Sequence, residues 1–310
     1  MITVMGASGN TGKKIAELLL RNGESVRVLG RSHGRLADLQ NAGAEVMVGD
    51  TTDIAFLTNA FRGADAVYTL LPTDPRNGDY RVQQDRQGEA IVNAIRRSGV
   101  KYVVALSSLG ADLNEGTGVI LGLHAQEERL KQLDDTNILL LRPVSFFENF
   151  YSSLPLIKSE GINGGSVIAD LAVPMIATRD IAEAAAKALK ARDWKGVVVR
   201  ELLGQRDLSH TEATRIIGKL IGKPDLQYIQ FSYKDEVTGL VNAGLSESFA
   251  RLYVDMTRAF NEGTIKPNRT SENTTATRFE DFAGELARSY EAMVTNEAFH
   301  TNVKTHQSSA

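Results

Sequence analysis

Cysteine is missing from all 310 residues of the sequence. Its absence excludes disulfide bonds, metal sites built on thiolates and redox sensing by cysteine, and it favours a reducing compartment. Long apolar runs are missing too, because stretches such as 138–141 and 197–199 fall far short of the roughly 18 residues that a membrane helix needs. The N-terminus has no basic segment and reaches a glycine at Gly6, so it does not resemble a signal peptide. We therefore expect a soluble, cytoplasmic protein.

An excess of charge of either sign is also missing. The chain has 35 Lys and Arg against 38 Asp and Glu, a formal net charge of -3, which gives no reason to expect a nucleic-acid partner. Hydrophobic residues make up 42% and charged residues 24%, which are ordinary values for a folded globular protein. A chain of this length predicts one large domain with a smaller lobe.

Strand and helix patterns alternate through the first half of the chain. Short apolar segments that predict buried strands are separated by amphipathic segments that predict helices, and this rhythm is typical of a doubly wound α/β sheet of Rossmann type. Such a sheet binds ligands at the carboxyl ends of its strands. The predicted strands are 1–5, 25–29, 44–48, 66–71, 102–106 and 138–141.

The rhythm loosens after residue 150, which predicts a smaller, mostly helical C-terminal lobe. We expect residues 1–150 to form an NAD(P)-binding domain, to which residues 175–205 return with a helix and a strand. Residues 206–295 then form the lobe that covers a substrate cleft, and residues 296–310 are a polar tail.

A glycine-rich loop follows the first predicted strand. Its glycines have the spacing G-x-x-G-x-x-G, which lets the backbone turn sharply and approach a pyrophosphate at the N-terminus of the next helix. The alternative is a tight strand–helix turn without a ligand. The position at the first strand–helix turn favours a dinucleotide. The residues that we assign to cofactor binding here are Gly6, Ser8, Gly9, Asn10, Thr11 and Gly12.

Arg31 and Asp50 follow the second and third strands. An NAD site usually has an acidic residue at the end of the second strand, whereas an arginine suits the 2′-phosphate of NADP(H). Arg31 therefore predicts NADP(H) as the cofactor, the alternative being a solvated surface arginine. Asp50 is placed to accept a hydrogen bond from the adenine edge, and capping of its own loop is the alternative.

Residues after the fourth and fifth strands are candidates for the nicotinamide end. Leu70 and Leu71 can form an apolar wall beside the nicotinamide. The hydroxyl of Ser107 can face the nicotinamide, and that of Ser108 a substrate carbonyl, although capping of a helix or turn is an equally good interpretation for both serines.

The Y-x-x-x-K pair of short-chain dehydrogenases is absent, because none of the eight tyrosines has a lysine four residues later. His124 is the candidate for proton transfer, since histidine titrates near neutral pH. The alternative for His124 is a capping or packing role. No H-x-x-x-H motif or carboxylate cluster supports a metal site.

These motifs together resemble the NmrA-like group of atypical short-chain dehydrogenases. The resemblance spans residues 1–290 and is closest to the branch of triphenylmethane reductases and NAD(P)H quinone oxidoreductases, in which a helix carries H-x-x-x-E, here His124 and Glu128. It implies a Rossmann domain, NADP(H) and a cleft under a small lobe. The matching segments are G-A-S-G-N-T-G at 6–12, Arg31, Ser107–Ser108, Arg142–Pro143, Phe147–Asn149, 177–182 and 240–244.

The resemblance leaves two functions open. The first is an oxidoreductase that transfers hydride from NADPH to a quinone, an azo compound or a similar conjugated small molecule, with solvent supplying the proton. Phe146, Phe147 and Phe150 would then line an apolar acceptor pocket, whereas their alternative role is to pack the lobe onto the sheet. The second function is a non-catalytic NADP(H)-binding redox sensor that acts through a protein partner. A homo-oligomer is compatible with both.

Overall fold

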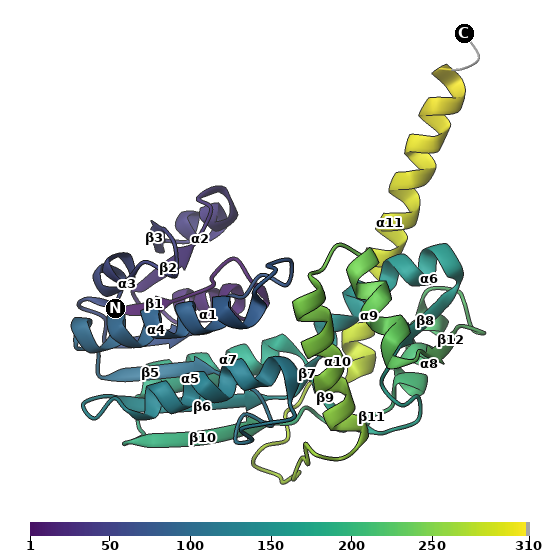
Figure 1. Cartoon of the computed structure of the whole chain (residues 1–310). Coiled ribbons are helices and arrows are strands. Elements are labelled where there is room, and N and C mark those ends of the chain that lie inside the picture. Colours follow the sequence, from purple (N-terminus) through teal and green to yellow (C-terminus); the bar gives the residue numbers. More distant parts are fainter. Residues whose placement is uncertain (308–310) are drawn as a thin grey trace.

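A seven-stranded parallel sheet forms the larger part of the molecule, for which the computed structural model describes residues 1–307 (Figure 1). The strand order is β10-β6-β5-β4-β1-β2-β3, and every pairing is parallel. This sheet confirms the predicted Rossmann-type fold. The strands are β1 (Ile2–Val4), β2 (Val26–Gly30), β3 (Glu45–Val48), β4 (Ala66–Thr69), β5 (Tyr102–Leu106), β6 (Asn137–Pro143) and β10 (Val197–Leu202).

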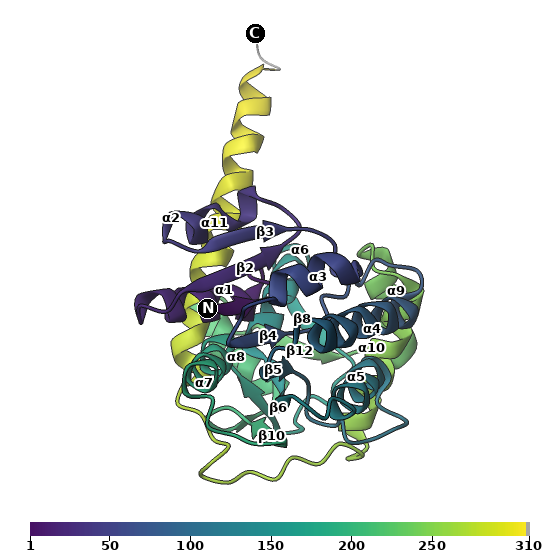
Figure 2. The same cartoon turned by 90° about the vertical axis from the view of Figure 1, so that its left-hand side faces the viewer.

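Helices cover both faces of this sheet, because alternate strand residues point to opposite sides and both sides are apolar. Val4 and Val104 belong to the core beneath one set of helices, whereas Met5 and Val103 belong to the core beneath the other. Figure 2 shows the two sets on opposite sides of the sheet. One set is α1 (Asn10–Arg21), α2 (Ala37–Asn41) and α7 (Thr178–Ala191), and the other is α3 (Ile54–Phe61), α4 (Tyr80–Ser98) and α5 (Leu121–Lys131).

A second body, the lobe, contains two small sheets, β11-β9-β7 and β12-β8, and most of the remaining helices. Its apolar core joins residues from 147–177 with residues from 208–290. The elements are β7 (Ser145–Phe146), α6 (Leu154–Glu160), β8 (Ile162–Gly165), β9 (Val173–Ile176), β11 (Asp207–Leu208), α8 (His210–Leu220), β12 (Gln227–Gln230), α9 (Tyr233–Asn242), α10 (Glu247–Asn261) and α11 (Phe279–Gln307). Three short 3₁₀ segments are η1 (Gly34–Leu36), η2 (Gly118–Ile120) and η3 (Phe147–Ser153).

The C-terminal helix α11 projects away from the lobe (Figure 1). Residues 296–307 of the predicted tail continue this helix, and residues 308–310 lie outside the described residues. The predicted division into 1–150 with 175–205, 206–295 and 296–310 stays a proposal about domain organisation. Whatever the division, the lobe core also draws on residues 147–177, which precede α7 in the chain.

The strand order reverses at β1. The chain builds outward from β1 through β2 to β3 and then returns to place β4 on the other side of β1. Loops leaving β1 and β4 therefore diverge at their carboxyl ends, and a doubly wound sheet binds its ligand in the crevice at such a point. The glycine-rich loop and Leu70 lie at this position.

Candidate functional site

The glycine-rich loop connects β1 to α1 in a tight turn. Gly6 has φ +62°, in the left-handed region that glycine adopts without strain, and its carbonyl accepts a hydrogen bond of 2.9 Å from the Gly9 amide. A Cβ atom at Gly12 would lie 2.4 Å from the Gly6 carbonyl oxygen. Glycine is therefore required at both ends of the loop, where the loop packs on itself, while Ser8, Gly9 and Asn10 at its tip are exposed.

The N-terminus of α1 is electrostatically prepared for an anion. Gly9 is the N-cap and offers no side chain to the helix, and the first turn carries no acidic residue. The first amide to bond back along the helix is that of Lys13, which donates to the Gly9 carbonyl over 3.1 Å. The amides of Asn10, Thr11 and Gly12 thus belong to the end of the helix, where donors are unpaired and the helix dipole is positive. A phosphate fits this end.

Leu70 lies against the same loop. A Cβ atom on Gly6 would come within 2.8 Å of Leu70 Cδ2, so this leucine fills the space that the glycine leaves. Leu71 packs instead with the core on the α3 and α4 side of the sheet. The two leucines therefore point to opposite faces, and Leu70 is the one that the structure brings to the predicted cofactor loop.

Arg31 and Asp50 line one cavity of about 370 Å³ over the carboxyl ends of β2, β3 and β4. Arg31 is exposed there. Asp50 Oδ1 accepts a hydrogen bond of 2.8 Å from the Thr52 amide, which is the capping role that the sequence left open. A cation and a carboxylate in one cavity suit a ligand that carries both a phosphate and a hydrogen-bond donor. The other lining residues are Gly49, Thr51, Thr52, Pro72, Gln83 and Gln87.

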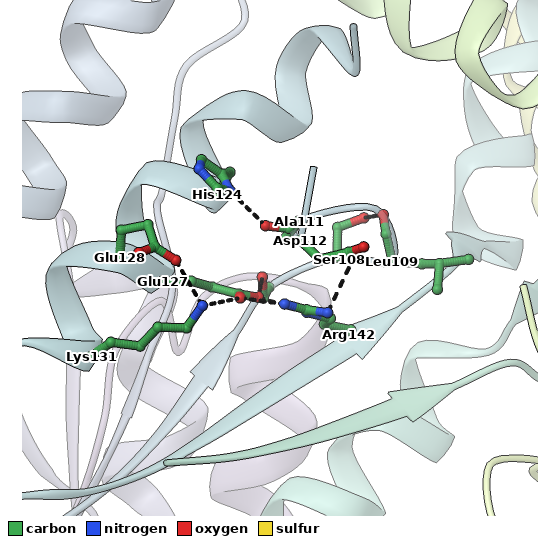
Figure 3. Close-up of polar contacts among 10 residues, drawn as sticks. Ser108, Leu109, Ala111, Asp112, His124, Glu127, Glu128, Lys131 and Arg142 are labelled. Atoms are coloured by element: carbon green, nitrogen blue, oxygen red, sulfur yellow. Dashed lines mark hydrogen bonds and ion pairs between the residues drawn. The ribbon is translucent and has the colours of Figure 1, made fainter. Parts of the chain in front are cut away.

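Ser107 at the end of β5 is hydrogen-bonded to a buried ion pair between Glu127 and Arg142, two residues that Figure 3 shows. Its hydroxyl donates to Glu127 Oε1 over 2.5 Å, and the same carboxylate receives two hydrogen bonds of 2.9 and 2.6 Å from Arg142. Glu127 is only 1% exposed, so its charge requires these partners. The hydrogen bond to Glu127 raises the pKa of Arg142. The third nitrogen of this guanidinium, Nη1, lies 3.3 Å from Asp112 Oδ1.

His124 lies one turn before Glu127 on α5. Its Nδ1 is 2.9 Å from the carbonyl oxygen of Ala111 (Figure 3). Because a carbonyl only accepts, Nδ1 carries a proton there, and in the neutral ring Nε2 is then the acceptor. Glu128, the other residue of the H-x-x-x-E motif, is exposed and pairs with Lys131 at 2.7 Å, a hydrogen bond that lowers the pKa of Glu128. The catalytic role of His124 stays a prediction.

The remaining predicted substrate residues are engaged in local or core contacts. The Ser108 hydroxyl donates to the Leu109 carbonyl over 3.0 Å. Phe147 and Phe150 are 3% and 6% exposed in the lobe core, with the Phe279 ring 5.0 and 5.2 Å away, so in this structure they have the packing role. Phe146, on β7, is partly exposed and packs against the core of the sheet.

Sequence reasoning missed several residues of this region. Thr51 and Thr52 directly follow Asp50, so the rule that ligands lie after strand ends would have included them. Gln83 and Gln87 lie on α4, and no local pattern relates them to Arg31. The sequence analysis also did not assign Glu127, because its pairing with Arg142 depends on how α5 packs over β6.

Two kinds of feature are absent from the part of the chain that the structure describes. Among the side chains described, those of residues 1–295, no group of three or more His, Asp and Glu is placed to hold a metal ion. None of the helices there is both long and apolar enough to span a bilayer.

Comparison with known proteins gives a consistent set of relatives. The model of the NmrA-like family matches residues 1–283. The chain is 29% identical to a (4-alkanoyl-5-oxo-2,5-dihydrofuran-3-yl)methyl phosphate reductase of Streptomyces griseus over 72% of this chain and 75% of that protein. It is 28% identical to quinone oxidoreductase 2 of Escherichia coli over 82% and 86% of the two chains. Among solved structures, the NADPH complex of the Escherichia coli quinone oxidoreductase QOR2 superposes with a TM-score of 0.78 at 23% identity, covering 92% of this chain and 99% of that one.

Proposed function

Since this chain belongs to the NmrA-like family, we propose that it is an NADPH-dependent reductase that transfers hydride to a quinone, an azo compound or a similar conjugated acceptor. The observation that carries the proposal is the pairing of two anion-binding features around one crevice. The N-terminus of α1 offers amides at the glycine loop, and Arg31 offers a guanidinium in the neighbouring cavity. Two phosphate positions on one ligand are what NADPH presents.

The relatives support the chemical class. Both curated relatives are named for the reduction or oxidation of small molecules, and one of them is named for quinones. The Escherichia coli structure was solved with NADPH. The names of these relatives share reduction or oxidation of a small molecule, and the solved structure adds NADPH, whereas the acceptor of this chain is the part that we propose.

The residues around the crevice fit the dinucleotide. Glycine at positions 6 and 12 lets the loop turn tightly against Leu70 and its own backbone, next to the amides at the start of α1. Arg31 would hold the 2′-phosphate through a charge-assisted hydrogen bond, and Asp50 would accept from the adenine amino group. When bound, NADPH supplies the hydride and both electrons.

At the predicted nicotinamide end, few side chains of the protein have a proton that is free to be donated to an acceptor. Ser107 donates its only hydroxyl proton to Glu127, and that carboxylate is neutralised by Arg142. His124 holds a proton at Nδ1 against Ala111 and leaves Nε2 to accept or, when the ring is protonated, to donate. A conjugated acceptor suits such a site, because its reduced form can take its proton from solvent.

Acceptor-dependent oxidation of NADPH tests the proposal. Purified protein is mixed with NADPH and either menadione or an azo dye, and the loss of NADPH absorbance is followed, with heat-denatured protein as the control. We expect oxidation that requires both the protein and an acceptor. Tight NADPH binding without oxidation by any quinone or azo compound would instead favour the redox sensor, and absence of NADPH binding would contradict both functions.

A further inference from the structure

Two buried hydroxyls meet directly beneath the glycine-rich loop. Tyr68 lies on β4, the strand beside β1, and is fully buried. Its hydroxyl is 3.0 Å from Oγ1 of Thr11, in the first turn of α1. Thr11 itself is 5% exposed and stands between Asn10 and Gly12, whose amides are among the unpaired donors at the start of α1. A polar pair at this place needs an explanation, since apolar packing would serve the core as well.

The direction of this hydrogen bond follows from what each hydroxyl needs. A phenol that is 0% exposed must donate its proton, because an unpaired buried donor is costly. Among the contacts described for residues 1–295, the Thr11 oxygen is the only acceptor that the structure gives to this phenol. Tyr68 is therefore the donor and Thr11 the acceptor. Burial raises the pKa of Tyr68, so the phenol keeps its proton at physiological pH.

The Thr11 hydroxyl proton is then left to find another acceptor. A hydroxyl has one donor and two acceptor positions, and Tyr68 occupies one of the acceptor positions. Across the described residues, the structure gives Thr11 Oγ1 no hydrogen bond in which it donates. A nearly buried donor without an acceptor lies in the same helical turn as the amides proposed to hold the phosphates.

We propose that Tyr68 is a positioning residue for the dinucleotide, because its hydroxyl bond to Thr11 directs the Thr11 hydroxyl proton toward the bound pyrophosphate. The inference rests on the proposed function, since it needs NADPH at the glycine loop. Tyr68 touches no ligand and acts through Thr11. The specific consequence is that the pair contributes to the binding of the bridging phosphates and not to the binding of the 2′-phosphate at Arg31.

Two ligands and three variants separate this role from a purely structural one. NADPH and adenosine 2′-monophosphate, which lacks the bridging phosphates, are each titrated directly by calorimetry. The variants are Tyr68→Phe, Thr11→Val and the double variant. Thr3→Val is the matched control, because it removes another buried hydroxyl bond of the same sheet, from Thr3 on β1 to the Ala60 carbonyl at 3.1 Å. Thermal melts show that each variant is folded.

We expect Tyr68→Phe and Thr11→Val each to weaken NADPH binding by roughly three- to tenfold, the net size of one ordinary hydrogen bond. The double variant should lose no more NADPH affinity than the more strongly affected of the two single variants, because both changes remove the same interaction. Binding of adenosine 2′-monophosphate should stay within twofold in all variants, and Thr3→Val should change neither ligand.

Three results would overturn the inference. Unchanged NADPH affinity in Tyr68→Phe would show that the tyrosine only fills the core. Equal weakening of both ligands would indicate a general distortion of the site, and additive losses in the double variant would show that Tyr68 does not act through Thr11. A wild-type protein that binds adenosine 2′-monophosphate but not NADPH would contradict the proposed function and this inference with it.

Discussion

The phosphate end and the predicted acceptor end of the crevice are built in opposite ways. At the phosphate end, the first turn of α1 has no side-chain cap and no acidic residue, and Arg31 is exposed in its cavity. At the acceptor end, Ser107 is bonded to Glu127, His124 to Ala111, and Phe147 and Phe150 are packed among other rings. The difference indicates that the polar groups without a protein partner serve to bind the proposed dinucleotide. Hydride transfer then depends on placement more than on an acid supplied by the chain.

A substitution at Gly12 should have the largest effect on this comparison, because it destroys the phosphate end. A Cβ atom there would lie 2.4 Å from the Gly6 carbonyl oxygen and 2.7 Å from the Gly6 carbonyl carbon. We expect Gly12→Ala to weaken NADPH binding by at least about a hundredfold, or about 2.7 kcal/mol. Calorimetric titration measures the loss. Gly239→Ala is the control, since a Cβ at Gly239 meets nothing within 4 Å, and equal affinity in both variants would refute the assignment of the loop.

The pH dependence of stability tests whether a polar ring of the lobe, that of His210, is buried in an apolar surrounding. Burial lowers the pKa of His210 to about 4, and its ring lies 5.7 and 5.2 Å from the rings of Phe150 and Tyr228. The unfolded chain binds this proton below about pH 6.5. It therefore binds more protons than the folded chain between pH 6.5 and pH 4, and stability falls as the pH falls through this window.

We expect the wild-type protein to lose about 1–2 kcal/mol from this histidine between pH 7 and pH 5. Urea unfolding at the two pH values measures the loss. His210→Phe should show a smaller difference between them, whereas His33→Ala, which removes an exposed histidine, should behave as the wild type does. An identical pH dependence in the His210 variant would show that the ring is hydrated in solution.

Arg31 tests the second feature of the phosphate end. We expect NADPH to bind at least tenfold more tightly than NADH, about 1.4 kcal/mol, because one guanidinium meets the 2′-phosphate. Arg31→Ala should remove most of this preference and leave NADH affinity unchanged. Arg200→Ala, an exposed arginine of β10, is the control. Equal affinities of the wild-type protein for the two dinucleotides would contradict the prediction.

The smallest effect is expected at the acceptor end. His124→Ala should lower turnover by roughly three- to tenfold, below the 10²–10⁴-fold typical of a general acid, and should leave NADPH affinity nearly unchanged. Steady-state rates of the wild-type protein and the variant provide the measurement. A hundredfold loss would mean that the acceptor end does supply an acid, and that the two ends are less different than the contacts indicate.

The parts that sequence predicts well are those set by neighbours in the chain. Gly6, Arg31 and Asp50 each follow a strand, so the strand pattern alone places them at one edge of the sheet. The parts that it misses depend on partners far away. Ser107 meets Glu127 only because α5 packs over β6, and Phe150 is covered by Phe279 from the last helix. Thr11 was assigned to the cofactor from its position, but its contact with Tyr68 could not be foreseen, since it depends on a side chain 57 residues away.

The route of the chain between the sheet and the lobe limits how these two bodies can move relative to each other. The chain leaves the sheet after β6, returns to it before α7, and leaves it again after β10, so several covalent connections cross from one body to the other. A hinge between the two bodies would have to bend all of these connections about one axis. Lys14 of α1 adds a further tie, since it pairs with Glu148 of η3 at 3.1 Å. We therefore expect the two bodies to keep their relative orientation. An acceptor would then enter through local movements of side chains and short loops.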